Sequence, residues 1–217
     1  MLSRRLRRCL DNVVGDVLYD IGTDHAYLPI AAVKEGRVKK AYAVDNKQGP
    51  LEAASRHIRE AGVASSVETR LASGLDGLPD DVDTVVIAGI GGGRIKSMLE
   101  AADGMNVRRF VLQPSTHPER VRGIVNVTSL KIVDEDAVAD KSGTHIIIVI
   151  EEGAQRLDEK ERLFGPVLLK ERPDAYYKKL IGELDFLNAL LERIPEGKAK
   201  AIRKKREYLK EVLHEWN

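Results

Sequence analysis

Short extended segments alternate with amphipathic ones through most of the chain. Strands are expected at residues 17–19, 40–44, 67–71, 83–88 and 109–112, where mostly apolar runs have the length of buried strands. Apolar positions at helical spacing come before and between them, at residues 2–14, 26–35, 50–61 and 94–102. This alternation predicts a largely parallel sheet that helices cover on both faces.

The pattern changes after the fifth strand. A helix bearing Arg120 is expected first, and residues 131–138 and 144–150 then predict an antiparallel hairpin at the sheet edge. From about residue 153 no strand pattern remains. Apolar residues between 177 and 194 step by three and four, as in a coiled coil, and a second such helix follows a break at 195–197. We therefore expect residues 1–152 to form an α/β domain and residues 153–217 an antiparallel helical hairpin.

Composition indicates a soluble globular protein. The chain has 217 residues, 43% hydrophobic and 32% charged, with a formal net charge of +1. A single cysteine, Cys9, excludes an internal disulfide and a thiolate zinc cluster, which is typical of a reducing cytosol. The apolar runs are far shorter than the roughly 20 residues of a membrane span. We expect a cytoplasmic protein with no membrane partner and no metal.

An acidic glycine turn follows the first strand. Gly22 can turn where a side chain would clash, and the turn leads into a helix at the sheet edge that receives ligands in open α/β folds. The carboxylates of Asp20 and Asp24 suit amine and ribose hydroxyl groups, which favours an adenosyl-amino-acid ligand. A dinucleotide fingerprint is disfavoured, since Asp24 and Leu28 occupy its second and third glycine positions. A plain structural turn is the alternative.

Later strand ends carry compatible residues. Asp45, followed by Asn46, lies 23 residues beyond Gly22, near the spacing at which an acidic residue meets ribose hydroxyls. The turn containing Ser73, Gly74 and Leu75 falls at the edge that closes over an adenine. A glycine run at 89–93 lets a substrate approach the backbone closely, or is simply a flexible turn.

Two basic segments are candidates for phosphate contacts. Four arginines, including Arg4 and Arg5, cluster in the first helix, where a solvated face is an equal alternative. Residues 198–206 contain six basic residues and no acid, and among them are Lys204, Lys205 and Arg206. This stretch favours RNA contact. The alternative is a hairpin that dimerises through its seam.

Several motifs together resemble the bacterial TrmK family. They are DIGTDHAYLP at 20–29, GP at 49–50, IAGIGG at 87–92, LQP at 112–114 with His117 and Arg122, and FGP at 164–166. Members of that family are tRNA (adenine-N1)-methyltransferases acting on adenine 22. They combine a Rossmann-like class I methyltransferase sheet with a C-terminal coiled-coil domain, and the likeness runs from near residue 3 to the end.

The resemblance implies a division of roles among the site residues. Asp20, Gly22 and His25 would line the methionine end of S-adenosyl-L-methionine, Asp45 with Asn46 its ribose, and Ser73, Gly74 and Leu75 its adenine. Gly89 is also expected to contact the cofactor. With Gly91, Gln113, Pro114 and Ser115 it would frame the target base, and His117 and Arg122 would lie beside that base. Arg4, Arg5, Lys204, Lys205 and Arg206 would bind the tRNA by its phosphates.

The chain departs from the family pattern at several positions. Ser115 stands where the family typically has Asn, and a hydroxyl reaches less far and cannot offer the two hydrogen bonds of a carboxamide. Asp45 replaces Glu, Ile90 replaces Met, and a hairpin Tyr near His145 is missing. A methyltransferase acting on another substrate and a non-catalytic RNA-binding module therefore remain alternatives.

The expected reaction is an in-line methyl transfer, in which the cofactor supplies the chemistry and the protein the alignment. Adenine N1 lies on the Watson–Crick edge, so the base must leave its stack or pair. Methylation at N1 leaves a positive charge on the adenine, and our hypothesis is that Asp24 stabilises this charge. Ser115 and the backbone of 89–91 would hold the base. His25 and His117 are more typical of scaffold histidines than of bases. We expect a monomer or a weak homodimer.

Overall fold

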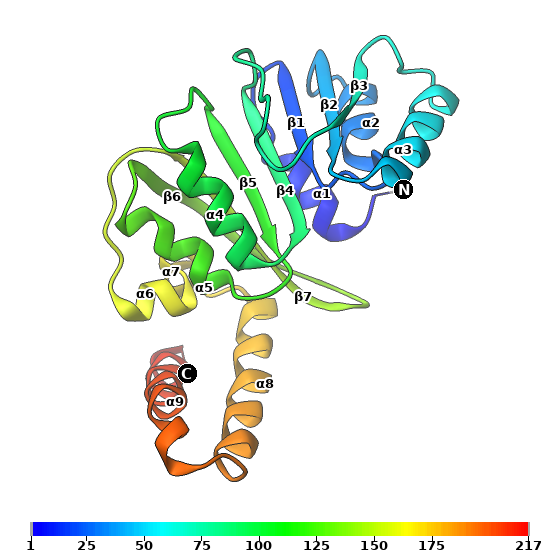
Figure 1. The fold of residues 1–217 in the computed structure, drawn as a ribbon. Helices are drawn as coiled ribbons and strands as arrows, with labels where there is room; N and C mark the ends of the chain where they lie inside the picture. Colours follow the sequence, from blue (N-terminus) through cyan, green and yellow to red (C-terminus); the bar gives the residue numbers. More distant parts are fainter. Residues whose placement is uncertain (1, 217) are drawn as a thin grey trace.

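A seven-stranded sheet forms the centre of the protein. The structure, a computed structural model, describes residues 2–216 except for the side chains of residues 196–198, so Lys198 of the predicted basic stretch lies outside the described residues. The strands are β1 (Val17–Ile21), β2 (Lys40–Asp45), β3 (Val67–Leu71), β4 (Thr84–Ile90), β5 (Arg109–Pro114), β6 (Leu130–Asp140) and β7 (Gly143–Glu152). Their order is β3-β2-β1-β4-β5-β7-β6 (Figure 1).

The pairing of the strands confirms the predicted mixed sheet. β1 to β5 pair in parallel, whereas β7 runs antiparallel to both β5 and β6. The strand order reverses direction between β1 and β4. In open α/β sheets a ligand crevice opens at such a point, outside the carboxyl ends of the strands. The acidic turn follows β1 directly at this position.

Helices cover both faces of the sheet, as the sequence predicts. α1 (Arg4–Asp11), α2 (Tyr27–Lys34) and α3 (Gln48–Glu60) bury one face, packing with Leu18, Val86 and Val111. α4 (Gly92–Ala102), α5 (Pro118–Arg122) and the short 3-10 helix η1 (Gly123–Asn126) bury the other. Successive residues of a strand face opposite sides of the sheet. Val85 and Ile87 therefore pack in the core beneath α4, α5 and η1, and Val86 packs in the core beneath α1, α2 and α3.

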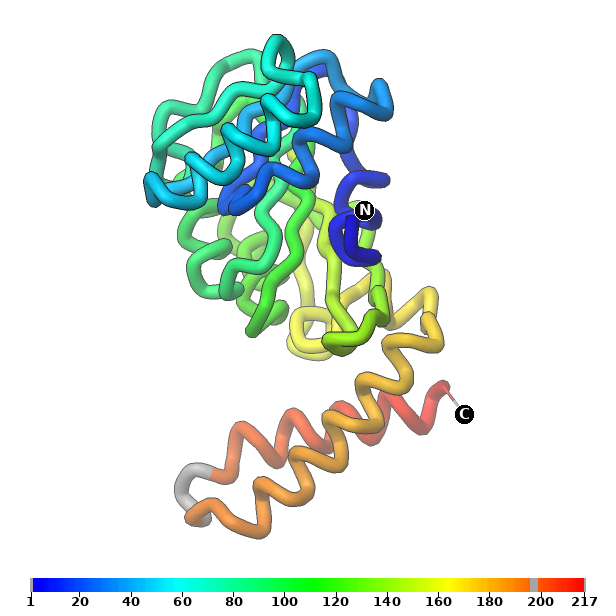
Figure 2. The backbone as a smooth tube through the Cα atoms, turned by 90° about the vertical axis from the view of Figure 1, so that its right-hand side faces the viewer, coloured from blue at the N-terminus to red at the C-terminus, as the bar shows by residue number. Residues whose placement is uncertain are grey.

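Four helices follow the sheet. α6 (Glu159–Phe164) and α7 (Pro166–Glu171) are short and stay against the sheet domain, and the sequence pattern does not predict them. α8 (Asp174–Leu191) and α9 (Glu196–Trp216) project beyond it as an antiparallel pair (Figures 1 and 2). Their return is fixed by Glu215 near the end of α9, whose carboxylate lies 2.7 Å from Lys160 Nζ and whose carbonyl accepts from Arg172. α8 ends before Ile194, the last predicted seam position.

A buried ion pair joins the sheet domain to these helices. Arg122 Nε lies 2.6 Å from Glu135 Oε1, and neither side chain has any exposed surface. Glu135 Oε2 also accepts from the Val167 N–H, and Arg122 Nη1 donates to the Leu163 carbonyl. A Cβ on Gly165 would overlap the Glu135 carboxylate, so glycine is required there. The prediction that Arg122 contacts substrate is therefore wrong in this structure, because its guanidinium is enclosed in the core.

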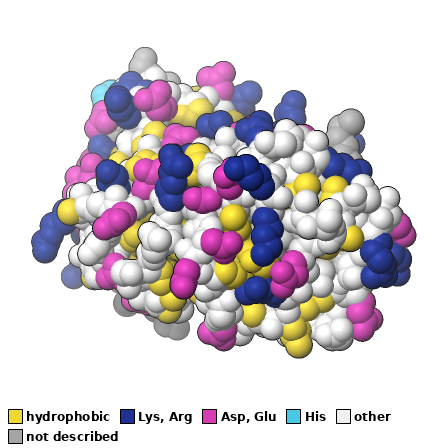
Figure 3. Space-filling view, turned by 90° about the horizontal axis from the view of Figure 1, so that it is seen from above, with side chains coloured by type: hydrophobic (Ala, Val, Ile, Leu, Met, Phe, Trp, Pro, Cys, Tyr) yellow, Lys and Arg dark blue, Asp and Glu magenta, His cyan; other side chains and the backbone are white. Residues whose placement is uncertain are grey.

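The outer surface carries both signs of charge. On the face in Figure 3, which is seen from above Figure 1, Lys and Arg side chains are interspersed with Asp and Glu. The arrowheads of β4 and β5 in Figure 1 point the other way, toward the side where α8 and α9 project. None of the helices within the described residues is both long enough and apolar enough to cross a membrane.

Candidate active site

The acidic turn is held by the neighbouring strand. The N–H groups of Gly22 and Thr23 both donate to the Val44 carbonyl, at 2.8 and 3.0 Å. Gly22 has φ +74°, and a Cβ there would approach Ile90 Cδ1 to 3.2 Å. Asp24 and Ala26 also adopt the left-handed region, which is uncommon for residues with side chains. This backbone turns the chain sharply into α2 and leaves the two aspartates at the sheet edge.

A cavity of about 330 Å³ opens beside this turn. One wall is the turn and the start of α2, and the other is the N-terminal segment with α1. Its lining residues are Leu2, Ser3, Arg5, Leu6, Asp20, Gly22, Thr23, Asp24, Tyr27, Leu28 and Ala88. The cavity therefore brings two carboxylates and one guanidinium together, as a zwitterionic amino-acid group would require. The sequence argument missed the contribution of the first helix, which comes from a distant part of the chain.

Asp20 is the buried acid of this cavity. Only 5% of the surface of Asp20 is exposed. Burial raises its pKa to about 7, the Thr23 hydroxyl opposes that rise, and the nearby Asp45 carboxylate adds to it. A buried carboxylate is costly unless it gains an opposite charge or a proton. An ammonium group in the cavity would supply that charge.

Asp24 and His25 lie differently from Asp20. The Asp24 side chain is 70% exposed at the cavity, with Oδ2 3.6 Å from His25 Nε2. The His25 ring packs within a cluster, with centroids 5.3 Å from Tyr27 and 5.2 Å from His57. His25 is not among the cavity-lining residues. The structure thus packs the His25 ring against Tyr27 and His57 and leaves Asp24 accessible to a ligand.

The ends of β2 and β3 form the next part of the edge. Asp45 Oδ1 accepts from the Lys47 N–H at 3.0 Å, and the Asp45 carbonyl accepts from Ala72 at 3.1 Å. Asn46 and Ser73 are exposed there, while Leu75 points into the core. Gly74 has φ +61° and a Cβ there would lie 3.4 Å from Met98. Asp45, Asn46 and Ser73 are thus open to a ligand, whereas Leu75 is buried.

The ends of β4 and β5 are joined by backbone hydrogen bonds. Ser115 N–H donates to the Ile90 carbonyl at 2.9 Å, and Gly92 N–H donates to the Thr116 carbonyl at 2.8 Å. A Cβ on Gly92 would overlap the His117 carbonyl, so this close approach requires glycine. The structure therefore brings the glycine run and the segment after Gln113 together, as the sequence predicts for a base-binding edge.

Arg5 crosses this edge from α1. Its Nη1 donates to Gln113 Oε1 at 2.9 Å and lies 3.8 Å from where a Cβ of Gly89 would be. Gln113 is buried, and its Nε2 donates to the Pro114 carbonyl at 3.1 Å. Arg5 therefore lies at the junction between the cavity and the predicted base-binding segments. No local sequence signal could reveal this contact, since its partners are 108 residues apart.

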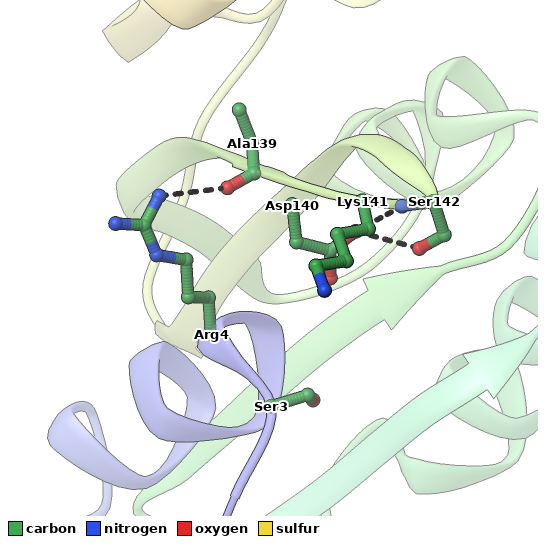
Figure 4. A pocket seen from close by; sticks show the side chains of 6 residues that line it. All are labelled: Ser3, Arg4, Ala139, Asp140, Lys141 and Ser142. Carbon is green, nitrogen blue, oxygen red and sulfur yellow. Dashed lines mark hydrogen bonds between the residues drawn. The ribbon is translucent and has the colours of Figure 1, made fainter.

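Arg4 lies beside a second, open hollow of about 740 Å³ between α1 and the β6–β7 turn (Figure 4). Its Nη1 donates to the Ala139 carbonyl at 3.3 Å. Across from it, Asp140 accepts from the N–H and hydroxyl of Ser142, and these bonds lower the pKa of Asp140 to about 2. This hollow is lined by neither the acidic turn nor the strand ends of the parallel sheet, so the smaller cavity is the better candidate for a nucleoside.

The remaining predicted residues have partners of their own. His117 adopts φ +54° and its Nδ1 lies 3.0 Å from Glu119, with the ring largely exposed. Lys204 pairs with Glu159, Lys205 with Glu183, and Arg206 with Glu207. The acids absent from the local sequence around Lys204 and Lys205 are supplied by α6 and α8. Among the described residues, no three His, Cys, Asp or Glu side chains are grouped as a metal site.

Comparison with known proteins agrees with this geometry. Residues 18–217 match the family TrmK, tRNA (adenine(22)-N(1))-methyltransferase. The tRNA (adenine(22)-N(1))-methyltransferase of Bacillus subtilis is 30% identical, over 98% of this chain and 97% of that protein.

Two solved structures with bound ligands have the same fold. Streptococcus pneumoniae Sp1610 in complex with S-adenosyl-L-methionine is 32% identical with a TM-score of 0.91, covering 99% of this chain and 100% of that one. M. capricolum TrmK in complex with S-adenosyl-homocysteine is 26% identical with a TM-score of 0.88, covering 99% and 98%. The acidic turn, the sheet order and these likenesses lead to one assignment: the chain belongs to the TrmK family of tRNA (adenine(22)-N(1))-methyltransferases.

Proposed function

We infer that this protein transfers a methyl group from S-adenosyl-L-methionine to N1 of adenine 22 in tRNA. The observation that carries this inference is the cavity at the end of β1, where buried Asp20 and accessible Asp24 face Arg5. Two relatives that share this fold over almost the whole chain have been solved with S-adenosyl-L-methionine or with its product bound. The family match supports the tRNA substrate.

The charges of the cavity suit the methionine end of the cofactor. Asp20 would receive the ammonium group, because a buried carboxylate gains most from a new cation. Arg5, the cation among the lining residues, would receive the carboxylate, and Gly22 leaves space beside it. Asp45 and Asn46 would meet the ribose hydroxyls. Ser73 and Gly74 would lie against the adenine, and Leu75 would support their turn from the core.

The target base would enter at the joined ends of β4 and β5. Gly89 and Gly91 present backbone without side chains, and Ser115 is exposed beside them. Gln113 and Pro114 form the floor, with the Gln113 amide held by Arg5. His117 lies at the end of this segment, where its contact with Glu119 favours a positioning role. The base must be flipped out of its stack to reach this edge.

The cofactor, when bound, supplies an electrophilic methyl group on its sulfonium. The N1 lone pair forms the new bond to the methyl carbon as the carbon–sulfur bond breaks, and the purine becomes cationic. Asp24 would stabilise that charge, since its carboxylate is exposed at the cavity beside the incoming base. The strand-end backbone and Ser115 would align N1 with the methyl group, which is the protein's main contribution in such reactions.

The chain would divide in function at residues 152 and 153. The sheet domain would carry the chemistry, and α8 with α9 would form a coiled-coil arm that contacts the tRNA. α7 would fix the root of this arm through Glu135, and α6 through the Leu163 carbonyl, which accepts from Arg122. We propose a cytoplasmic monomer or weak homodimer. Lys204, Lys205, Arg206 and Arg4 remain proposed phosphate contacts, although the three on α9 would have to exchange ion-pair partners.

One sequence of measurements tests this function. Calorimetry with S-adenosyl-L-methionine should show one bound molecule, and labelled methyl groups should then pass to bulk unmodified tRNA. Mapping the product should find the label at N1 of adenine 22. Cofactor binding with label at another position would favour a different methyltransferase, which Ser115 leaves as the second candidate. Cofactor binding without any transfer would favour a non-catalytic RNA-binding homologue.

A further inference from the structure

Two arginines flank the edge at which the target base would enter. Arg94 lies in the first turn of α4, three residues after Gly91, and Arg120 lies in α5, three residues after His117. Both residues are exposed. A rise of about 1.5 Å per helical residue keeps Arg94 within one turn of the glycine run. Neither arginine stands out in the sequence, because other charged residues lie close to each one, Lys96 and Glu100 on α4 and Glu119 and Arg122 on α5.

The fold brings these two arginines together. Arg120 Nη1 would lie 3.3 Å from a Cβ on Gly93, the residue next to Arg94. The Arg120 guanidinium therefore lies against the start of α4, beside the joined ends of β4 and β5. The absence of a side chain at Gly93 leaves room for it.

Their charges are available to a ligand. Among the described residues, which leave out the side chains of 196–198, neither Arg94 nor Arg120 makes a side-chain hydrogen bond or ion pair. The α9 cations differ, because Lys204, Lys205 and Arg206 each have a carboxylate partner. A phosphate that binds an unpaired guanidinium does not have to displace an existing ion pair.

We propose that Arg94 and Arg120 bind the tRNA backbone phosphates next to adenine 22. This inference rests on the proposed function. When a base is flipped into a pocket its own phosphates stay outside, at the rim of that pocket. The rim here consists of the first turns of α4 and α5. Arginine suits the role because its planar fork can bind two phosphate oxygens at once.

The first experiment compares salt dependence. Arg94→Gln/Arg120→Gln is measured for binding to unmodified tRNA over a range of salt concentrations, with Arg108→Gln as the matched control. Arg108 is also exposed and without a side-chain partner in the described part of the chain, but it precedes β5 at the opposite edge of the sheet. Each lost phosphate contact should lower the slope of log K against log salt by roughly 0.7 to 0.9.

The expected result is a slope reduced by about 1.5 in the double variant and unchanged in the control, with equal cofactor affinity in all three proteins. Because both arginines are exposed and unpaired, thermal melting should match the wild type. An unchanged slope in the double variant would overturn the proposal. If the wild type fails to methylate adenine 22, the proposed function fails instead, so the two failures are distinguishable.

A second experiment locates the contacted phosphates. A tRNA assembled with neutral methylphosphonate linkages on both sides of adenine 22 should bind the wild type more weakly than ordinary tRNA. The double variant should not distinguish the two RNAs, because the protein partners of those phosphates are gone. Equal losses for the wild type and the double variant would show that the arginines bind elsewhere and would contradict the proposal.

Discussion

Asp20 is the buried carboxyl that we propose as the partner of the cofactor's ammonium group. It is the penultimate residue of the buried strand β1, and burial raises its pKa to about 7. A carboxyl with that pKa is largely protonated in the free protein at slightly acidic pH. It becomes a good partner for an ammonium group once ionised, so cofactor binding and deprotonation are linked.

Cofactor affinity should therefore rise with pH. Below pH 7 the Asp20 proton must be released before the ammonium group can pair with the carboxylate, which weakens binding up to about tenfold per pH unit. Above pH 7 the affinity should level off. Calorimetry between about pH 6 and pH 8, in buffers of different ionisation enthalpy, measures both affinity and proton release. Asp20→Asn should bind weakly with no such pH dependence, and a pH-independent wild type would exclude this role.

Asp24 should affect turnover more than cofactor binding. We expect Asp24→Asn to lower kcat by roughly 100-fold or more, since it removes a charge that stabilises the cationic product. The Kd for the cofactor should change little. Asn is a better probe than Ala because position 24 has φ +52°, which Asn tolerates more readily. Loss of cofactor affinity in this variant would instead assign Asp24 to the cofactor site.

At the level of elements, one polar joint connects five segments. Glu135 on β6 pairs with Arg122 of α5 and accepts from the start of α7, while Arg122 donates to the last turn of α6. Tyr176 of α8 adds a bond to the Phe164 carbonyl at 2.7 Å. These bonds fix the root of the helical arm relative to the segment that begins at Gln113. The joint requires the glycine of the FGP motif, since a Cβ on Gly165 would overlap the Glu135 carboxylate.

Breaking this joint should cost much of the protein's stability. Arg122→Met leaves the Glu135 carboxylate buried without its partner, and we expect a loss of about 3–5 kcal/mol in urea unfolding. Lys96→Met is a suitable control, because it removes an exposed pair with Glu100 on α4 and should cost less than about 1 kcal/mol. Similar losses in the two variants would mean that the buried pair contributes no more than a surface one.

At the scale of the whole molecule, the arm and the strand ends lie on the same side. α8 and α9 project on the side toward which β4 and β5 point (Figure 1). An RNA held by the arm could thus reach the edge where the cofactor cavity and the glycine run meet. The opposite face carries interspersed charges of both signs (Figure 3).

The arm formed by α8 and α9 should contribute to tRNA affinity, and it should contribute neither to cofactor binding nor to contact between two copies of the chain. Lys204→Gln/Lys205→Gln/Arg206→Gln should raise the KM for tRNA several-fold and leave both the cofactor Kd and the sedimenting mass unchanged. Lys204 and Arg206 pair with carboxylates at the surface, and surface ion pairs contribute little to folding, so the helices should stay folded. A changed mass with unchanged tRNA affinity would show that this stretch serves contact between two copies. Unchanged values of both would leave these residues with a purely local pairing role.

The sequence predicted the positions of helices and strands far better than it predicted which side chains contact each other. Strand and helix positions followed from apolar periodicity, and the hairpin of β6 and β7 was confirmed. The short helices α6 and α7 were missed, because six residues are too few to show a helical period. Arg122 was misassigned, since its neighbours in the chain give no sign of Glu135 on another strand. The sequence around Lys204 and Lys205 contains no acid, but the fold supplies one to each of them, Glu159 from α6 and Glu183 from α8.

The sequence by itself determined the sheet, the turn at Gly22 and the identity of the acids at the strand ends. These features depend on neighbouring residues, and their spacing is visible in the chain. The tertiary structure decided which charges are paired and which remain free. It placed Arg5 against Gln113 and enclosed Arg122 with Glu135. It also left Arg94 and Arg120 beside the ends of β4 and β5 with no side-chain partner in the part of the chain that the structure describes. Burial and charge pairing arise between residues far apart in the chain, so they could be assigned only after the chain was folded.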